Sequence, residues 1–272
     1  MNKKMLLAAA LAWLAFLSPV AAQTCAPGTC CNTNPTTGTP TCDKAAGNPI
    51  NVTSGNKFQR EVDMPALPGV LGLELVRYYN SEAALADQRS ILGRGWRLSY
   101  EAELAFVPGG DRITVYQGDG TQTRYEKAWV QFEPGVTVYN TNEPGQSSLR
   151  AQQVAGSLEY SLTLTNGNRQ TFDAQGKLVR ITAPTGEYVT LQRDVAGFLL
   201  RVTDPQGRFL SLRHLPPHEA RTTTKFRGVQ FIDSPVGRFA YTYGSTMPAG
   251  SDAKPEVLIA NLVKVALPTH YD

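Results

Sequence analysis

Short runs of alternating apolar and polar residues, separated by turn residues, dominate this chain. Leu158, Tyr160, Leu162 and Leu164 alternate with polar residues and are followed by the pair Asn166-Gly167. Both positions of an Asn-Gly pair tolerate a positive φ, so this stretch predicts a strand that ends in a tight hairpin. Helical periodicity is plausible only in SEAALADQR, residues 81–89, where Ser81 is expected to cap a short helix. The pattern therefore predicts an all-β protein.

Glycine recurs at a nearly constant interval in the second half of the chain. The turn glycines are Gly167, Gly176, Gly186, Gly197 and Gly207. Three of them close an Asp-x-x-Gly motif, in the pairs Asp173 with Gly176, Asp194 with Gly197, and Asp204 with Gly207. The Asp side chain accepts hydrogen bonds from N–H groups inside such a turn, and Gly supplies the φ that other residues resist. One short strand and one turn fit each interval, so we expect a long antiparallel ribbon of hairpins built from repeats of about twenty residues.

Alternation also predicts which apolar side chains share a face of each strand. The expected groups are Val179 with Ile181, Val189 with Leu191, Phe198 with Leu200 and Val202, and Leu210 with Leu212. The pattern continues more loosely in residues 233–243, where one extra residue separates Asp233 from Gly237. Residues 115–126 have the same turn-then-strand form around Asp119-Gly120.

The first 22 residues have the pattern of a secretory signal peptide. Lys3 and Lys4 precede an apolar run, residues 5–17, and small residues precede a cleavage point before Gln23. The alternative is an uncleaved anchor, although the run is short for a membrane span. Cleavage removes two of the 26 Lys and Arg residues and none of the 23 Asp and Glu residues, which leaves a net charge of +1. Nothing in this balance indicates the basic patch typical of nucleic-acid binders. No later apolar run is long enough to span a bilayer, so we expect the mature protein to be soluble or peripheral. The signal peptide predicts Sec-dependent export to the periplasm, the cell surface or the medium.

All four cysteines follow this cleavage point closely. They are Cys25, Cys30, Cys31 and Cys42. An oxidising compartment favours disulfides, and a bond between two adjacent cysteines would be strained, so Cys25 and Cys42 are each expected to pair with one of the other two. The alternative is a metal site, but no His is near and the spacing matches no zinc pattern. Residues 23–46 are rich in Pro, Gly, Thr and Asn and are predicted to be a disulfide-stapled lead-in.

Residues that could carry catalysis are scarce. Pro216 and Pro217 exclude the helix that a metal pair of His214 and His218 would need, so these histidines are expected in a solvent-exposed loop, with a loop metal site as the alternative. Asp204-Pro205 is the one Asp-Pro step, whereas a paired-carboxylate mechanism needs two close groups. Asp204 is therefore predicted to be a turn residue. We expect no catalytic residue, no cofactor and no metal.

The strand aromatics have two interpretations. They are Tyr78, Tyr79, Trp96, Tyr100, Phe106, Tyr116 and Tyr125. Cross-strand packing is the first interpretation, and a carbohydrate-binding platform is the alternative.

Two stretches resemble a known family. FDAQGKLVRITAPTGEYVTLQRDVAGFLLRVTD, residues 172–204, resembles the Rhs or YD repeat, with Phe172 where the family usually has Tyr. Residues 47–81 and 92–104 are similar to the domain that opens the repeat region of many bacterial Rhs proteins. The resemblance implies a sheet of YD repeats that spirals into a hollow shell around a C-terminal toxin.

The chain has too few repeats to enclose a cargo and carries no toxin domain, so the resemblance implies an open, incomplete shell. A truncated gene, a fragment and a small stand-alone relative all fit this expectation. The expected division is residues 1–22 signal peptide, 23–46 lead-in, 47–157 opening β domain and 158–272 repeat region. The expected function is that of a non-catalytic exported structural module. The alternative is a cell-surface carbohydrate-binding or adhesion module.

The expected partners are the remaining shell, a toxin polypeptide or a second copy. A second copy would bind through an exposed C-terminal edge with an apolar face carrying Leu262, Val263 and Val265. A cell-surface glycan is the partner under the alternative function. No nucleic acid is expected.

Overall fold

The computed structural model describes residues 45–46, 50–51, 55–85, 89–216, 227–244 and 261–268. These ranges are built almost wholly from antiparallel strands, and their one helix is α1 (Ser81–Leu85). No helix among them has the length and apolar character that crossing a membrane requires. The prediction of an all-β protein is confirmed.

The first part of the chain forms three small antiparallel units. β1 (Ala45–Ala46) pairs with β2 (Ile50–Asn51), and β5 (Arg89–Ser90) pairs with β6 (Gly93–Arg94). β4 (Leu75–Asn80) is the central strand of a three-stranded sheet, between β3 (Phe58–Met64) and β7 (Trp96–Leu98).

All later strands form one sheet of fourteen strands, in which each strand lies beside its neighbours in the chain. The strands are β8 (Glu103–Phe106), β9 (Arg112–Tyr116), β10 (Gln122–Lys127), β11 (Val136–Asn140), β12 (Leu149–Val154), β13 (Ser157–Thr163), β14 (Arg169–Phe172), β15 (Leu178–Thr182), β16 (Tyr188–Arg193), β17 (Leu199–Thr203), β18 (Phe209–His214), β19 (Val229–Ser234), β20 (Gly237–Tyr243) and β21 (Leu262–Ala266). The ribbon of consecutive hairpins is therefore as predicted. The sheet continues across residues 157 and 158, where the boundary between the opening β domain and the repeat region was expected.

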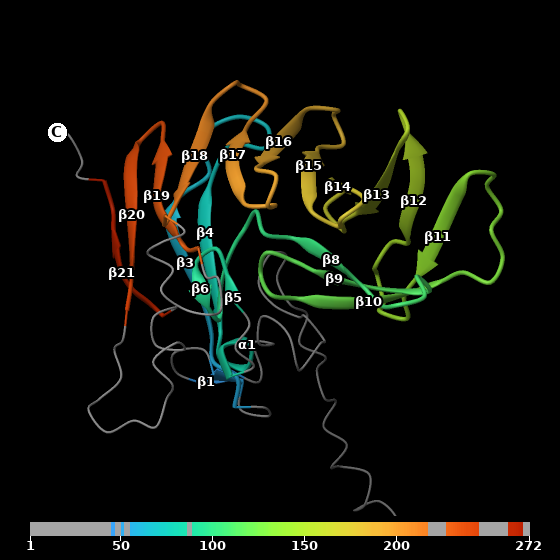
Figure 1. The fold of residues 1–272 in the computed structure, drawn as a ribbon, viewed down its shortest axis with the longest axis horizontal. Helices are drawn as coiled ribbons and strands as arrows, with labels where there is room; N and C mark the ends of the chain where they lie inside the picture. The colour runs from blue at the N-terminus through green and yellow to red at the C-terminus, as the bar shows by residue number, and fades with distance from the viewer. Residues whose placement is uncertain are drawn as a thin grey trace, which may run out of the picture.

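The sheet curls but stays open, with β8 and β21 as its two edges. Figure 1 shows β8, β9 and β10 running beneath the row of later strands, while β3 and β4 lie beside β17 and β18. The β8 edge meets the β14–β15 turn, where Leu104 N donates to Gly176 O at 2.8 Å and Glu103 forms an isolated bridge with Lys177. The three-stranded sheet and the fourteen-stranded sheet share one apolar core, because Met64 and Leu75 belong to the same buried cluster as Leu210 and Ile232.

The five turns from Gly167 to Gly207 share one backbone geometry. In the turn at Asp173, Gly176 N donates to Asp173 O at 2.9 Å and Asp173 N donates to Lys177 O at 2.9 Å. The corresponding two bonds recur in the other four turns, and all five glycines have positive φ. The hairpin predicted at Asn166-Gly167 is confirmed, and of its two residues only Gly167, with a φ of +83°, has a positive φ. Two consecutive positive φ values occur in the hairpin at Ala155-Gly156 and in the β8–β9 hairpin at Gly109-Gly110.

Alternation is interrupted in every second strand of the repeat region by a β-bulge. The register shifts between Thr171 and Phe172, which leaves Val179 as an extra residue in β15. Leu200 in β17, Gln230 in β19 and Val263 in β21 are extra residues of the same kind. A bulge places two residues opposite one and resets the alternation of side chains.

The bulges overturn three of the expected faces. The core-facing pairs are Leu178 with Ile181, Leu199 with Val202, and Leu262 with Val265. The grouping of Val179 with Ile181 was therefore wrong, and so was that of Phe198 with Leu200 and Val202, since Leu200 is exposed and Val202 is buried. The face carrying Leu262, Val263 and Val265 was also wrong, since Val263 is exposed. The bulge-free strands β16 and β18 do follow alternation, because Val189, Leu191, Leu210 and Leu212 are buried as predicted.

The helix is shorter than predicted and has a different cap. α1 ends at Leu85, and Arg89 lies in β5. Asn80 Oδ1 accepts hydrogen bonds from Glu82 N at 2.9 Å and Ala83 N at 3.1 Å, which is the role of an N-cap. Ser81 was the wrong choice because its hydroxyl accepts a bond from Lys57 N at 2.8 Å and donates to Asn56 Oδ1 at 2.9 Å.

Candidate functional site

The repeat-turn aspartates use their carboxylates within their own turns. Asp173 Oδ1 accepts from Gln175 N at 3.0 Å and from Lys177 N at 2.8 Å. Asp194 and Asp204 accept from the residues two and four positions later in the same way. Two N–H donors per carboxylate hold each loop in shape while the glycine takes the left-handed φ.

The turn at Asp204 also attaches the repeat sheet to the opening part of the chain. The Asp204 side chain is fully buried, and its Oδ2 accepts from Arg208 Nε at 2.7 Å. Arg208 Nη2 then donates to Pro68 O at 2.7 Å. The aspartate of the single Asp-Pro step is thus bonded to its turn and to Arg208.

A buried ion pair forms a second attachment between the two sheets. Arg77 in β4 donates from Nε to Asp63 Oδ2 at 2.6 Å and from Nη2 to Asp63 Oδ1 at 2.9 Å. Tyr241 in β20 donates to the same Asp63 Oδ2 at 2.9 Å. Burial raises the pKa of Tyr241, and the neighbouring Asp63 raises it further, so the hydroxyl remains a donor. This arrangement pairs the charges and fixes the register between the sheets.

Glu101 anchors the loop between β5 and β6 from inside. Its carboxylate accepts from Ile91 N at 2.9 Å and from Leu98 N at 2.7 Å. Burial raises the pKa of Glu101, and this effect outweighs the lowering by Arg97 and by the two N–H donors. Ile91 O in turn accepts from Val229 N at 2.7 Å and lies 3.1 Å from the Tyr243 hydroxyl. Strands β19 and β20 are thereby tied to the opening region.

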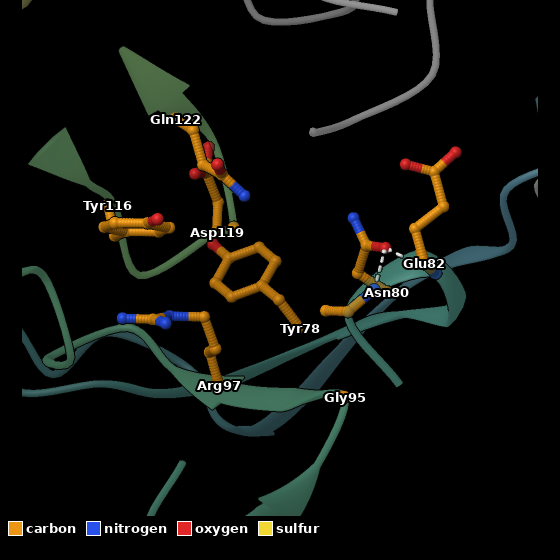
Figure 2. A pocket seen from close by; sticks show the side chains of 10 residues that line it. Tyr78, Asn80, Glu82, Gly95, Arg97, Tyr116, Asp119 and Gln122 are labelled. Carbon is orange, nitrogen blue, oxygen red and sulfur yellow. Dashed lines mark hydrogen bonds between the residues drawn. The ribbon is translucent and has the colours of Figure 1, made fainter. Parts of the chain in front are cut away.

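A small pocket of about 210 Å³, lined mainly by residues with polar side chains, lies between α1, β7 and the β9–β10 turn. Figure 2 shows the Tyr78 ring between Arg97 and Asp119, with Glu82 pointing away from the other labelled side chains. Arg97 Nη2 donates to Glu101 O at 2.6 Å, and its guanidinium lies 5.9 Å from the centre of the Tyr116 ring. Burial raises the pKa of Tyr78 despite the nearby Arg60, so its hydroxyl stays protonated. The pocket therefore offers donors and a cation to a small polar molecule.

The backbone packs closely beside this pocket. A Cβ added to Gly95, whose φ is +72°, would lie 2.6 Å from Ala84 Cβ and 3.0 Å from Asn80 O. Only glycine allows β7 to approach α1 this closely.

No three His, Cys, Asp or Glu side chains of the described ranges lie close enough together to hold a metal ion. His214 was expected in a solvent-exposed loop, and this expectation was wrong. His214 ends β18 and is half-buried, with Nδ1 3.1 Å from Arg227 O and Nε2 2.8 Å from Leu199 O. Residues 1–22, the cysteines at positions 25, 30, 31 and 42, and His218 lie outside the described residues, so the signal peptide, the disulfides and the lead-in remain predictions.

Of the seven aromatics named as a sugar platform, two are buried, four are half-buried and one, Phe106, is exposed. Tyr100 and Tyr125 are buried, and Tyr79 packs on Trp96 with ring centres 5.2 Å apart. Among the described residues the most exposed aromatics are Trp129 and Phe132, which sequence reasoning missed. A signal was present, because the run AWVQF, residues 128–132, places three large apolar residues in four positions without strand alternation.

The fold is that of proteins with an open antiparallel sheet in which successive hairpins are added in chain order. Residues 172–208 match the family model described as RHS Repeat. Residues 47–125 match the model described as Domain of unknown function (DUF6531). The two matches fall on the stretches that carried the resemblance, so the chain contains an RHS repeat region preceded by this domain, as the resemblance predicted.

The chain is also similar to a solved structure, the N-terminal domain of effector protein SpvB from Salmonella typhimurium strain LT2. The two are 14% identical over 70% of this chain and 75% of that chain, with a TM-score of 0.39. A comparison with curated proteins gave no match.

Proposed function

We propose that this protein is an exported, non-catalytic structural module of an Rhs-type β shell, which encloses or delivers a toxin polypeptide. The observation that carries the proposal is the position of β21 at one edge of a sheet built by successive hairpins. Among the described residues β21 pairs only with β20, so its outer backbone groups can receive a further strand. The partner would be another part of the shell or, in its place, a second copy of the chain.

The side chains of β21 agree with such a partner. Leu262 and Val265 pack partly on the core, while Val263 and the following Leu267 are exposed. A long edge with exposed apolar residues tends to pair with another chain unless charge or Pro protects it. Lys264 and Pro268 are the protecting residues nearby.

Sedimentation of the exported chain at micromolar concentration tests this proposal. We expect self-association, which Val263→Lys should weaken because a lysine at the edge disfavours strand addition. Val154→Lys in β12 is the matched control, because Val154 and Val263 are both 37% exposed but β12 is paired on both sides. A monodisperse wild-type monomer with protected amides in residues 262–266 would contradict the proposal.

Export is a separate part of the proposal and rests on the N-terminal sequence. Intact mass of the exported protein should show a chain that begins at Gln23 and has lost four hydrogens through two disulfides. Retention of residues 1–22 would contradict cleavage, and four free thiols would contradict the disulfides.

Carbohydrate binding is the second candidate function, and one observation favours it. The rings of Trp129 and Phe132 are exposed beside a polar hollow in the surface.

A further inference from the structure

The loop between β10 and β11 presents large apolar side chains to solvent. Relative exposure is 103% for Trp129, 87% for Phe132 and 59% for Val130. Isolated exposed apolar residues are ordinary on protein surfaces, but a cluster that includes a Trp marks a binding surface more often than chance.

The loop that carries these rings is held in place by its own hydrogen bonds. Gln131 donates from Nε2 to Ala128 O at 2.7 Å and accepts at Oε1 from Val138 N at 2.7 Å. Ala128 N donates to Val138 O at 2.9 Å, and Glu133 forms an ion pair with Arg150. The rings are therefore displayed by an ordered loop, which lowers the entropy that a ligand would have to overcome.

A hollow of about 750 Å³ adjoins these rings, a size within the range of about 300–1,000 Å³ typical of small-molecule sites. We name it the aromatic basin. Its lining includes three outward side chains of β10, which are Gln122, Arg124 and Glu126. It also includes Asn140 at the end of β11 and residues 141–143 after that strand. Asn140 Oδ1 accepts from Ser148 Oγ at 2.7 Å, which fixes the orientation of this amide.

The basin combines an aromatic wall with a polar lining of balanced charge. Arg124 and Lys127 supply two positive charges, while Glu126 and Glu143 supply two negative charges. The centre of a protein–protein interface is normally depleted of charged residues, so this lining suits a polar ligand better than an apolar protein surface. The balance of charge favours a neutral ligand over an anion or a cation.

We propose that the aromatic basin binds a neutral oligosaccharide. Trp129 and Phe132 would stack on the apolar C–H faces of sugar rings. The amides of Gln122 and Asn140, together with the Glu126 carboxylate, would exchange hydrogen bonds with sugar hydroxyls. This site is independent of the β21 edge, since it lies on the β10–β11 part of the sheet.

Binding of the exported full chain to defined neutral trisaccharides tests the proposal. The probes are maltotriose, cellotriose and triacetylchitotriose, followed by an array of neutral glycans, with isothermal titration for any probe that binds. We expect saturable binding of at least one glycan, weakened about tenfold or more by Trp129→Ala and also weakened by Phe132→Ala. Val195→Ala is the matched control, because Val195 is 111% exposed in the β16–β17 turn and far from the basin in the strand order.

Two results would overturn the proposal. One is the absence of any neutral glycan signal for a chain that circular dichroism shows to be folded. The other is glycan binding that Trp129→Ala and Phe132→Ala leave unchanged. If Trp129→Ala reduced self-association in sedimentation while no glycan bound, the loop would be a protein-docking surface and the proposal would be wrong.

Discussion

The hydroxyl of Tyr241 lies 2.9 Å from Asp63 Oδ2, although 178 positions separate the two residues in the chain. Asp63 also pairs with Arg77, and the two side chains are only 4% and 9% exposed. Breaking a buried ion pair leaves an uncompensated charge inside the protein, whereas losing one hydroxyl leaves the pair intact. The joint between the opening sheet and the repeat sheet therefore depends mainly on the carboxylate.

Asp63→Ala should lower the free energy of unfolding by about 3–5 kcal/mol, because Arg77 would be buried without a partner. Tyr241→Phe should lower it by only about 1 kcal/mol, since both Arg77 bonds to Asp63 remain. Urea denaturation of the two variants and the wild type measures both values. Equal losses in the two variants would show that the ion pair does not dominate this joint.

Gly176→Ala should destabilise the fold more than Gly197→Ala. Both glycines have positive φ, +78° and +86°, and a non-glycine residue in this region costs about 1–2 kcal/mol. A Cβ at Gly197 meets open space, but a Cβ at Gly176 would lie 2.6 Å from Leu104 O and would push β8 away. Denaturation midpoints of the two variants test this, and Gly197→Ala serves as the control for the backbone term alone.

Leu199→Ala should lower the free energy of unfolding by about 2–5 kcal/mol, because Leu199 is completely buried. Leu200→Ala should change it by less than about 1 kcal/mol, because Leu200 is the bulged residue and is 41% exposed. Simple alternation of the strand predicts the opposite order. Chemical denaturation of the two variants thus decides between the bulged register and the alternating one.

Glu103→Gln should reduce the loss of stability in acid. Burial raises the pKa of Glu103, but Arg97 and Lys177 outweigh it and hold this pKa below its usual value of 4.5. Because the folded-state pKa is lowered, the stabilisation is present above about pH 4.5 and is lost as pH falls through the folded-state pKa. Denaturation at pH 6 and at pH 3 should show a smaller difference for Glu103→Gln than for the wild type.

Glu126→Gln is the control for this pH effect, because Glu126 is an exposed glutamate in β10. The difference in stability between pH 6 and pH 3 should be the same for the Glu126→Gln variant as for the wild type. If Glu103→Gln also matched the wild type, the ion pair between Glu103 and Lys177, 2.6 Å long, would contribute nothing measurable.

The sequence alone determined where the chain turns. In each Asp-x-x-Gly motif the carboxylate bonds to N–H groups two and four residues later, and the glycine supplies its own φ, so all the determinants lie within five residues. The antiparallel order follows, since a short turn between two strands leaves them side by side. The family resemblance rested partly on these motifs, where the RHS Repeat model matches, and partly on residues 47–81 and 92–104, where the other family model matches.

The tertiary structure decided which side chains face the core in the bulged strands. A bulge exists only between two paired strands, so Leu199 rather than Leu200 is buried for a reason that lies partly in β16. The same holds for the pairing of Asp63 with Tyr241, which is not encoded by neighbours in the chain. Local rules specify turns because their hydrogen bonds are local, whereas burial depends on packing between segments far apart in sequence.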